Sequence, residues 1–118
     1  MDFYAPLPKE PRLQQMAKSI VQSPDQRKRL SDWAHHFNCS ERTLARHTQH
    51  HTGMSFSRWQ QQLLVLLAMQ KLGNGQAVKR ITADFGYESP SPFIALFKAI
   101  VGMTPGQFSQ QHLHRPIN

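Results

Sequence analysis

One pattern occurs twice in this sequence, and the two copies decide its fold. The first copy reads LSDWAHHFNCSERTLARHTQHHTGMS over residues 30–55, and the second reads VKRITADFGYESPSPFIALFKAIVGMT over residues 78–104. Each copy has apolar residues at helical spacing, a short turn, a hydroxyl residue and a second apolar stripe. A short helix, a tight turn and a second, capped helix are therefore predicted twice.

Matched positions of the two copies hold similar residue types. Asn38 matches Gly86, and these two types best tolerate left-handed backbone at the end of a helix. After one extra residue in the second turn, Ser40 matches Ser89 as a helix cap. The other matches are Trp33 with Ile81, Phe37 with Phe85, Leu44 with Phe93, and Gly53-Met54-Ser55 with Gly102-Met103-Thr104. This outline predicts two helix-turn-helix motifs, whose second helix enters the DNA major groove.

The rest of the chain is also predicted to be helical, and no alternating β-branched run indicates a strand. Leu13, Met16, Ala17, Ile20 and Val21 form an apolar stripe in the first helix. The expected class is all-α, with about seven helices in two helix-turn-helix subdomains joined by a central helix. The expected boundaries are a linker over residues 1–11 and a domain over 12–118, with the first motif at about 30–53, the connecting helix at about 55–72 and the second motif at about 76–102.

Prolines mark the start of the last two helices. The first amides of a helix have no intrahelical acceptor, so proline loses nothing there. We expect Ser89 to cap the helix, which places Pro90 and Pro92 at its first and third positions. Thr104 and Gln107 are predicted to form a capping box for the following helix.

The chain is strongly basic, with 14 Lys+Arg against 7 Asp+Glu in 118 residues, a net charge of +7 and a pI near 10.2. This balance favours an anionic partner, most often nucleic acid. The longest apolar run, residues 63–69, is too short to span a bilayer, and no secretory signal opens the chain. A single cysteine, Cys39, excludes an internal disulfide and favours a reducing cytoplasm.

The connecting helix has a length that suits two DNA-binding motifs. Residues 55–72 would extend roughly 27 Å at about 1.5 Å per residue. Two recognition helices in adjacent major grooves on one face of DNA lie roughly 34 Å apart. Phe56, Trp59, Leu63, Leu66 and Leu67 are predicted to face inward, and Leu64 and Val65 indicate burial on more than one side.

These features resemble the DNA-binding domain of the AraC/XylS family of bacterial transcription regulators. The motifs that match are SERTLAR at residues 40–46, TGMSFSRW at 52–59, GYESPSPF at 86–93 and GMTPGQF at 102–108. The resemblance covers about residues 12–110. It implies a bacterial, cytoplasmic and nucleoid-associated promoter binder, with RNA polymerase as a further partner. It also implies a separate N-terminal effector-sensing domain, which this chain lacks.

The chain departs from the family pattern at several positions. Thr48 stands where an aromatic or large apolar residue is usual, so Leu44 is expected to be the main anchor of the first recognition helix. Thr82 replaces the usual alanine at the crossing of the second pair of helices. Gln60, Leu64 and Leu67 stand where arginines are common, which predicts fewer phosphate contacts from the connecting helix and raises the alternative of a self-association surface.

Outward residues of the two recognition helices are the candidates for reading bases. Arginine binds guanine bidentately, and alanine can contact a thymine methyl group. In the first helix these candidates are Arg42, Ala45, Arg46 and Gln49, and in the second they are Ser91, Ile94 and Ala95. We expect the first motif to do most of the base readout. The candidates for phosphate contacts are Ser40, Thr43, Arg58, Lys79, Arg80 and Lys98.

Other functions have weaker support in the sequence. His47 and His51 have the i, i+4 spacing of metal ligands, but nothing obvious completes the site, so we expect surface or packing histidines and no metal or cofactor. Cys39 is interpreted as a small buried thiol rather than a redox sensor. No nucleophile motif, phosphate loop or acidic pair indicates an enzyme. The rival hypothesis is an all-α adaptor that binds an acidic protein and makes no contact with DNA.

Overall fold

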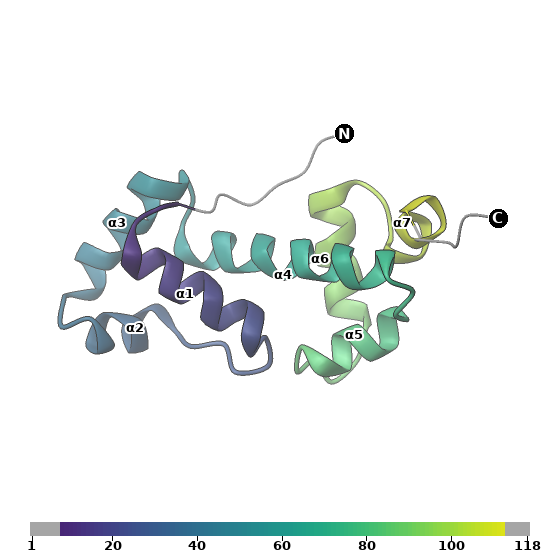
Figure 1. Ribbon diagram of the computed structural model, residues 1–118, viewed down its shortest axis with the longest axis horizontal. Coiled ribbons are helices and arrows are strands. Elements are labelled where there is room, and N and C mark those ends of the chain that lie inside the picture. The colour runs from purple at the N-terminus through teal and green to yellow at the C-terminus, as the bar shows by residue number, and fades with distance from the viewer. Residues whose placement is uncertain (1–7, 113–118) are drawn as a thin grey trace. The chain divides into compact units, whose positions relative to one another are not determined.

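A computed structural model describes residues 8–112 of the chain, and these residues form seven α-helices and no strand (Figure 1). The predicted all-α class is therefore confirmed. No helix in the described part is long and apolar enough to cross a membrane. The helices are α1 (Pro11–Gln22), α2 (Leu30–His36), α3 (Glu41–Thr52), α4 (Phe56–Gly73), α5 (Val78–Asp84), α6 (Ser91–Val101) and α7 (Pro105–His112).

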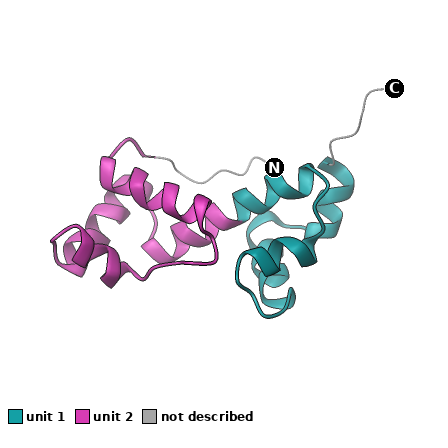
Figure 2. Ribbon diagram, turned by 60° about the horizontal axis from the view of Figure 1, so that its bottom comes forward, with its two compact units in different colours: residues 1–3, 65–118 teal, residues 4–64 magenta. Residues whose placement is uncertain are grey.

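The helices are divided between two compact units (Figure 2). In chain order, described residues 8–64 belong to the first unit (magenta, unit 2 in the key of Figure 2) and residues 65–112 to the second (teal, unit 1 in the key), so α4 contributes residues to both. The first unit holds the α2–α3 pair and the second holds the α5–α6 pair. Each unit thus contains one of the two predicted helix-turn-helix motifs. The predicted linker falls mostly on residues 1–7, which lie outside the described part of the chain.

The core of the first unit is formed by the inward faces of α1 to α3 and the start of α4. Leu13 and Met16 of α1 are fully buried, as are Leu44 and Trp59. Val21 does not belong to this core, because it is 47% exposed, and its predicted place in the apolar stripe is wrong. Residues 13, 16, 17 and 20 form the buried face of α1. Val21 follows Ile20 in the last turn, and the helical rotation of one residue turns its side chain away from that face.

Aromatic rings dominate the core of the second unit. Phe93 of α6 contacts Phe85 edge-on, with ring centroids 5.6 Å apart, and Phe97 contacts Phe108 of α7 at 5.8 Å. All but Phe108 of these four rings are completely buried. The apolar residues of α6 do not all belong to this core, because Leu96 and Ile100 are only half-buried. The buried stripe of α6 follows Phe93, Phe97 and Val101.

The turn inside each motif has the left-handed backbone that the repeat predicts. Asn38 has φ of 59° and Gly86 has φ of 86°. The next residue closes the turn in both copies, because the Cys39 amide donates to the Ala34 carbonyl and the Tyr87 amide to the Thr82 carbonyl, each at 3.0 Å. Cys39 itself is half-buried, so the prediction of a buried thiol is not accurate.

Side-chain caps begin α3 and α7 as predicted, and α4 has one as well. The Thr43 amide donates to Ser40 Oγ at 3.0 Å, and the Arg58 amide donates to Ser55 Oγ at 3.2 Å. Thr104 and Gln107 form the expected capping box, in which the Thr104 amide donates to Gln107 Oε1 and the Gln107 amide donates to Thr104 Oγ1. These bonds satisfy amides that have no intrahelical acceptor.

The start of α6 differs from the prediction. The helix begins at Ser91, its cap position is Pro90 rather than Ser89, and Pro92 is its second residue. The Pro90 backbone is already helical, with φ of −68° and ψ of −24°, and its carbonyl accepts the Ile94 amide at 2.9 Å. The prolines still occupy positions that need no amide, so they start the helix without a side-chain cap.

The inner face of α3 holds more than one anchor. Leu44 is the one apolar residue of α3 that is buried, and Thr48 and Thr52 are buried with it on the same face. Thr48 Oγ1 donates to the Leu44 carbonyl at 2.8 Å, and Thr52 Oγ1 donates to the Thr48 carbonyl at 2.7 Å. Both hydroxyls therefore find a partner inside their own helix, which removes the cost of burying them.

The connecting helix α4 is buried on more than one side, as Leu64 and Val65 predicted. Both are buried, together with Phe56, Trp59 and Leu63. Leu66 and Leu67 are only half-buried, so their predicted inward orientation needs correction. Burial of Leu64 also means that it cannot contribute to a self-association surface.

Candidate nucleic-acid interface

The outer face of α3 carries the residues expected to read bases in the first motif. Arg42, Arg46 and Gln49 are exposed, and Ala45 is half-buried beside them. Leu44 and Thr48 hold the opposite face in the core, so packing determines which way the arginines point. Arg46 also lines a hollow of about 480 Å³ together with Thr43, His47 and His50. The face is thus polar, cationic and open to a partner.

Ser40 and Thr43 lie at the start of α3, and their hydroxyl groups contact each other. Ser40 Oγ accepts a hydrogen bond from the Thr43 amide and donates one to Thr43 Oγ1 at 2.8 Å. The hydroxyl proton of Thr43 remains available to another acceptor. Of these two predicted phosphate ligands, Thr43 is therefore the better donor, while Ser40 mainly caps the helix.

A carboxylate from the segment before α1 contacts α3. Glu10 Oε1 lies 3.1 Å from His47 Nε2 and 3.2 Å from Arg12 Nε, and Glu10 Oε2 accepts the Leu13 amide at 2.9 Å. Partial burial acts to raise the pKa of Glu10, but the Leu13 amide, His47 and Arg12 together lower this pKa below its usual value. Glu10 therefore caps α1 and fixes its start against α3, a contact that the sequence did not suggest.

The histidines of α3 pack against one another. The rings of His47 and His51 lie edge-on with centroids 4.5 Å apart, and those of His50 and His51 are 5.0 Å apart. Among the described residues, no group of three or more potential ligands is arranged to hold a metal ion. These contacts favour the interpretation of the histidines as packing and surface residues.

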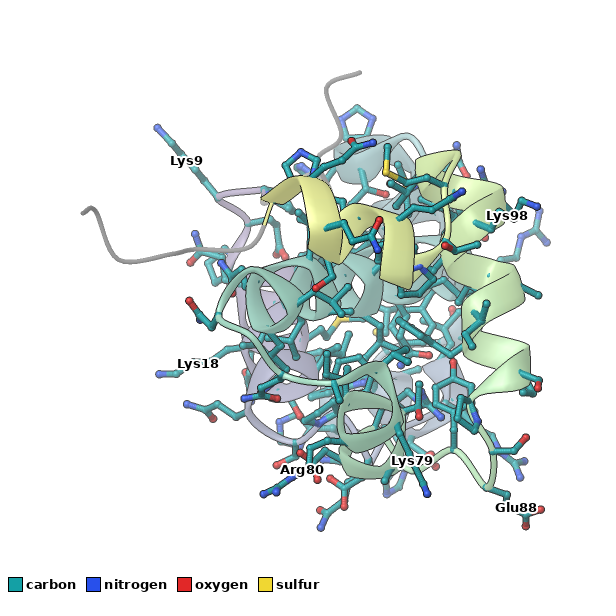
Figure 3. The ribbon with its side chains drawn as sticks, turned by 90° about the vertical axis from the view of Figure 1, so that its right-hand side faces the viewer. Lys9, Lys18, Lys79, Arg80, Glu88 and Lys98 are labelled. Carbon is teal, nitrogen blue, oxygen red and sulfur yellow. The ribbon has the colours of Figure 1, made fainter. Side chains whose placement is uncertain are left out.

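The second motif presents a less cationic face. Ser91 and Ala95 of α6 are exposed and Ile94 is half-buried, while Lys98 near the end of the helix is exposed. Figure 3 shows Lys98 extending outward from α6, and Lys79 and Arg80 extending outward from α5. Arg80 Nε lies 3.5 Å from Asp84 Oδ2, an exposed pair that contributes little to stability and that a phosphate could displace. Arg58, the last of the predicted phosphate ligands, is exposed in the first turn of α4.

Three further cationic residues lie in the loop before α2, and the sequence analysis did not select them. Arg27, Lys28 and Arg29 line a pocket beside the first turn of α4. They form the longest uninterrupted cationic run in the chain, which was the signal that could have identified them. Their position outside both motifs explains why the repeat did not point to them.

The two helix pairs and their exposed faces together define a class of protein. Each unit pairs a short helix with a capped second helix across a left-handed turn, and the outer face of each second helix is exposed. Such a chain is a double helix-turn-helix domain.

Comparison with known proteins identifies the family. A family model described as a helix-turn-helix domain matches residues 33–111. The chain belongs to this family, in its AraC type, and the resemblance seen in the sequence is confirmed. It is 36% identical over 106 residues to the HTH-type transcriptional regulator NimR of Escherichia coli (strain K12), covering 90% of this chain and 39% of that protein.

Solved structures share the fold. One is an AraC-type transcriptional regulator from Chromobacterium violaceum, with a TM-score of 0.77 and 20% identity, covering 90% of this chain and 96% of that one. Another is the DNA-binding domain of the global transcriptional factor AdpA in complex with a target DNA, with a TM-score of 0.74 and 21% identity, covering 87% and 93%. The matching family model is a helix-turn-helix domain and NimR is a transcription regulator, which supports the prediction that the chain is not an enzyme.

Proposed function

We propose that this chain binds promoter DNA as the DNA-binding domain of a transcription regulator, with α3 and α6 in adjacent major grooves of one duplex. The observation that carries this proposal is the exposed pair of arginines on α3, which point outward because the opposite face of the helix is buried. The chain's membership of a helix-turn-helix family with a transcription regulator as relative supports it. The spacing of roughly one helical turn of DNA between the two recognition helices is part of the proposal.

Two kinds of contact are proposed for the interface. Arg42, Arg46 and Gln49 read base edges in the first motif, with Ala45 close enough for a thymine methyl group. Ser91, Ile94 and Ala95 offer a small, mostly apolar surface, so the second motif reads shape or methyl groups and contributes less discrimination. The proposed phosphate contacts come from Ser40, Thr43, Arg58, Lys79, Arg80 and Lys98.

The chain spans 39% of the NimR regulator, so the partners of a whole protein are also proposals. We infer an N-terminal effector-sensing domain in the full regulator and RNA polymerase as a further partner. A bacterial cytoplasmic location with association to the nucleoid follows from binding promoter DNA. The boundaries proposed for the domain are residues 12–118, with residues 1–11 as the linker to the sensing domain.

The experiment is a selection of bound fragments from a sheared bacterial genome. The proposal predicts enrichment of a small set of fragments with a shared motif. The rival function, an adaptor for an acidic protein, predicts no enrichment above the input and binding to an acidic protein that duplex DNA does not compete away. Membership of the helix-turn-helix family favours the first outcome.

A further inference from the structure

A cationic pocket lies in the first unit, away from the proposed base-reading face of α3. Its volume is about 360 Å³, and it is formed between the loop before α2 and the first turn of α4. Arg27, Lys28 and Arg29 line it from the loop, and Ser57 and Gln60 line it from α4. None of the residues that line the pocket is acidic.

Apart from the apolar side chains of Leu30 and Phe56, the groups that line this pocket include several hydrogen-bond donors. The amide of Ser57 is in the first turn of the 18-residue helix α4, where amides have no intrahelical acceptor and the helix dipole is positive. Gln60 Nε2 is buried and has no hydrogen-bond partner among the described residues. The Asp32 carboxylate accepts the Arg29 amide at 3.0 Å but does not line the pocket. A site with several donors, positive charge and no carboxylate suits an anion.

Lys28 is held in place from the other side. Its Nζ lies 4.6 Å from the centroid of the Trp33 ring, a cation–π arrangement that restricts the side chain. Trp33 is buried in α2, with only 3% of its surface exposed. Trp33 lines a neighbouring hollow and not this pocket, so the Lys28 ammonium adds positive charge beside the pocket rather than a preformed contact inside it.

We propose that this pocket binds one backbone phosphate of the DNA on which α3 is docked. The inference rests on the proposed function. In helix-turn-helix proteins the first helix of the motif crosses the phosphate backbone while the second lies in the groove. The pocket is at the N-terminal end of α2, the first helix of this motif, so a phosphate there belongs to the same duplex. Such a contact fixes the position and orientation of the domain on the duplex and adds affinity, but it does not distinguish one base sequence from another.

The test places a negative charge in the pocket without disturbing the fold. Ser57→Asp puts a carboxylate at an exposed position of the first turn of α4, where the helix dipole favours an acidic residue. The matched control is Gln14→Asp, which makes the same charge change at an exposed position early in α1 that lines no described pocket. Thermal melting of both variants checks that they fold like the parent.

Binding of the parent and of both variants to one selected duplex is measured across salt concentrations. Ser57→Asp is expected to weaken binding about tenfold, as for loss of a charge-assisted contact, and to reduce the salt slope by about one unit. Gln14→Asp should leave the slope unchanged. A duplex in which single phosphates are replaced by neutral methylphosphonates then locates the contact, because one replacement should weaken the parent but not Ser57→Asp.

The outcomes separate this inference from the proposed function. If the parent binds the duplex, and Ser57→Asp and Gln14→Asp have equal affinities and equal salt slopes, the pocket does not contact DNA while the proposed function stands. If the pocket instead serves an acidic protein, Ser57→Asp will bind DNA like the control and lose only that protein. If the parent fails to bind any duplex, both the proposed function and this inference are wrong.

Discussion

Glu10 Oε1 lies 3.1 Å from His47 Nε2, so the residue that caps α1 also contacts the helix proposed to read DNA. Three groups favour the charged form of this carboxylate, and its pKa is lowered in the folded protein. A lowered pKa means that the stabilisation is present above the unfolded pKa of about 4.3 and is lost as pH falls through the lower, folded value.

The first prediction therefore concerns Glu10→Gln. This variant should be less stable than the parent at pH 7, because a neutral amide lacks the negative charge that interacts with Arg12 and with the Leu13 amide. The difference between their melting temperatures should shrink as the pH falls below the unfolded pKa of about 4.3 and through the lower pKa of the folded carboxylate. Thermal melting of both proteins between pH 3 and 7 measures this difference in melting temperature. A difference that stays constant over the range would contradict the proposal that the charge of Glu10 stabilises the fold.

The second prediction concerns the anchor of α3. Leu44 is completely buried, so Leu44→Ala should lower the free energy of unfolding by about 2–5 kcal/mol. Exposed Gln49→Ala on the same helix is the matched control and should change stability by less than about 0.5 kcal/mol. Urea unfolding of both variants provides the values. Equal midpoints for Leu44→Ala and the parent would show that α3 is not held by this face.

The third prediction concerns Thr48, a buried hydroxyl residue of α3. Thr48 is completely buried and its hydroxyl donates to the Leu44 carbonyl, so we expect Thr48→Phe to overpack the core and to lower the free energy of unfolding by about 1–3 kcal/mol. An unfolding midpoint for Thr48→Phe above that of the parent would reveal unused volume beside α3.

The architecture was largely predictable from the sequence, because the repeat encodes it through local rules. Asn38 and Gly86 marked the two left-handed turns, and Ser40 and Thr104 marked helix starts by hydrogen bonds that span only three residues. The errors were of another kind. Val21 and Leu66 lie at the edges of apolar stripes, where the exposed fraction of a side chain depends on how closely neighbouring helices pack. Helical periodicity alone does not predict that fraction.

The candidate site was only partly predictable. Outward residues of α3 follow from helical periodicity once Leu44 is placed inside. The contact between Glu10 and His47 joins residues 37 positions apart in the chain, and no periodic pattern links them. The pocket around Arg29 likewise needs the loop before α2 and the start of α4 together, which only the folded chain provides.

The fourth prediction separates the two motifs. Arg46→Ala should cost about 1–3 kcal/mol on the preferred site and relax the choice of base at particular positions. Lys98→Ala should weaken all sequences alike and reduce the salt slope by about one unit, as expected for a phosphate contact. Ser91→Ala should do little. Competition within a randomised DNA pool measures all three, and a preference that survives Arg46→Ala but changes with Ser91→Ala would reverse the proposed division of labour.

The most direct test of the central claim is the affinity of the domain for a selected duplex and for a scrambled duplex of equal length and composition, measured across salt concentrations. The account predicts that log affinity for both falls linearly with log salt as counterions are released, and that the selected duplex stays tighter by about 10³-fold or more at physiological salt. Absence of binding to either duplex at low salt, or equal affinity for the two at every salt concentration, would contradict it.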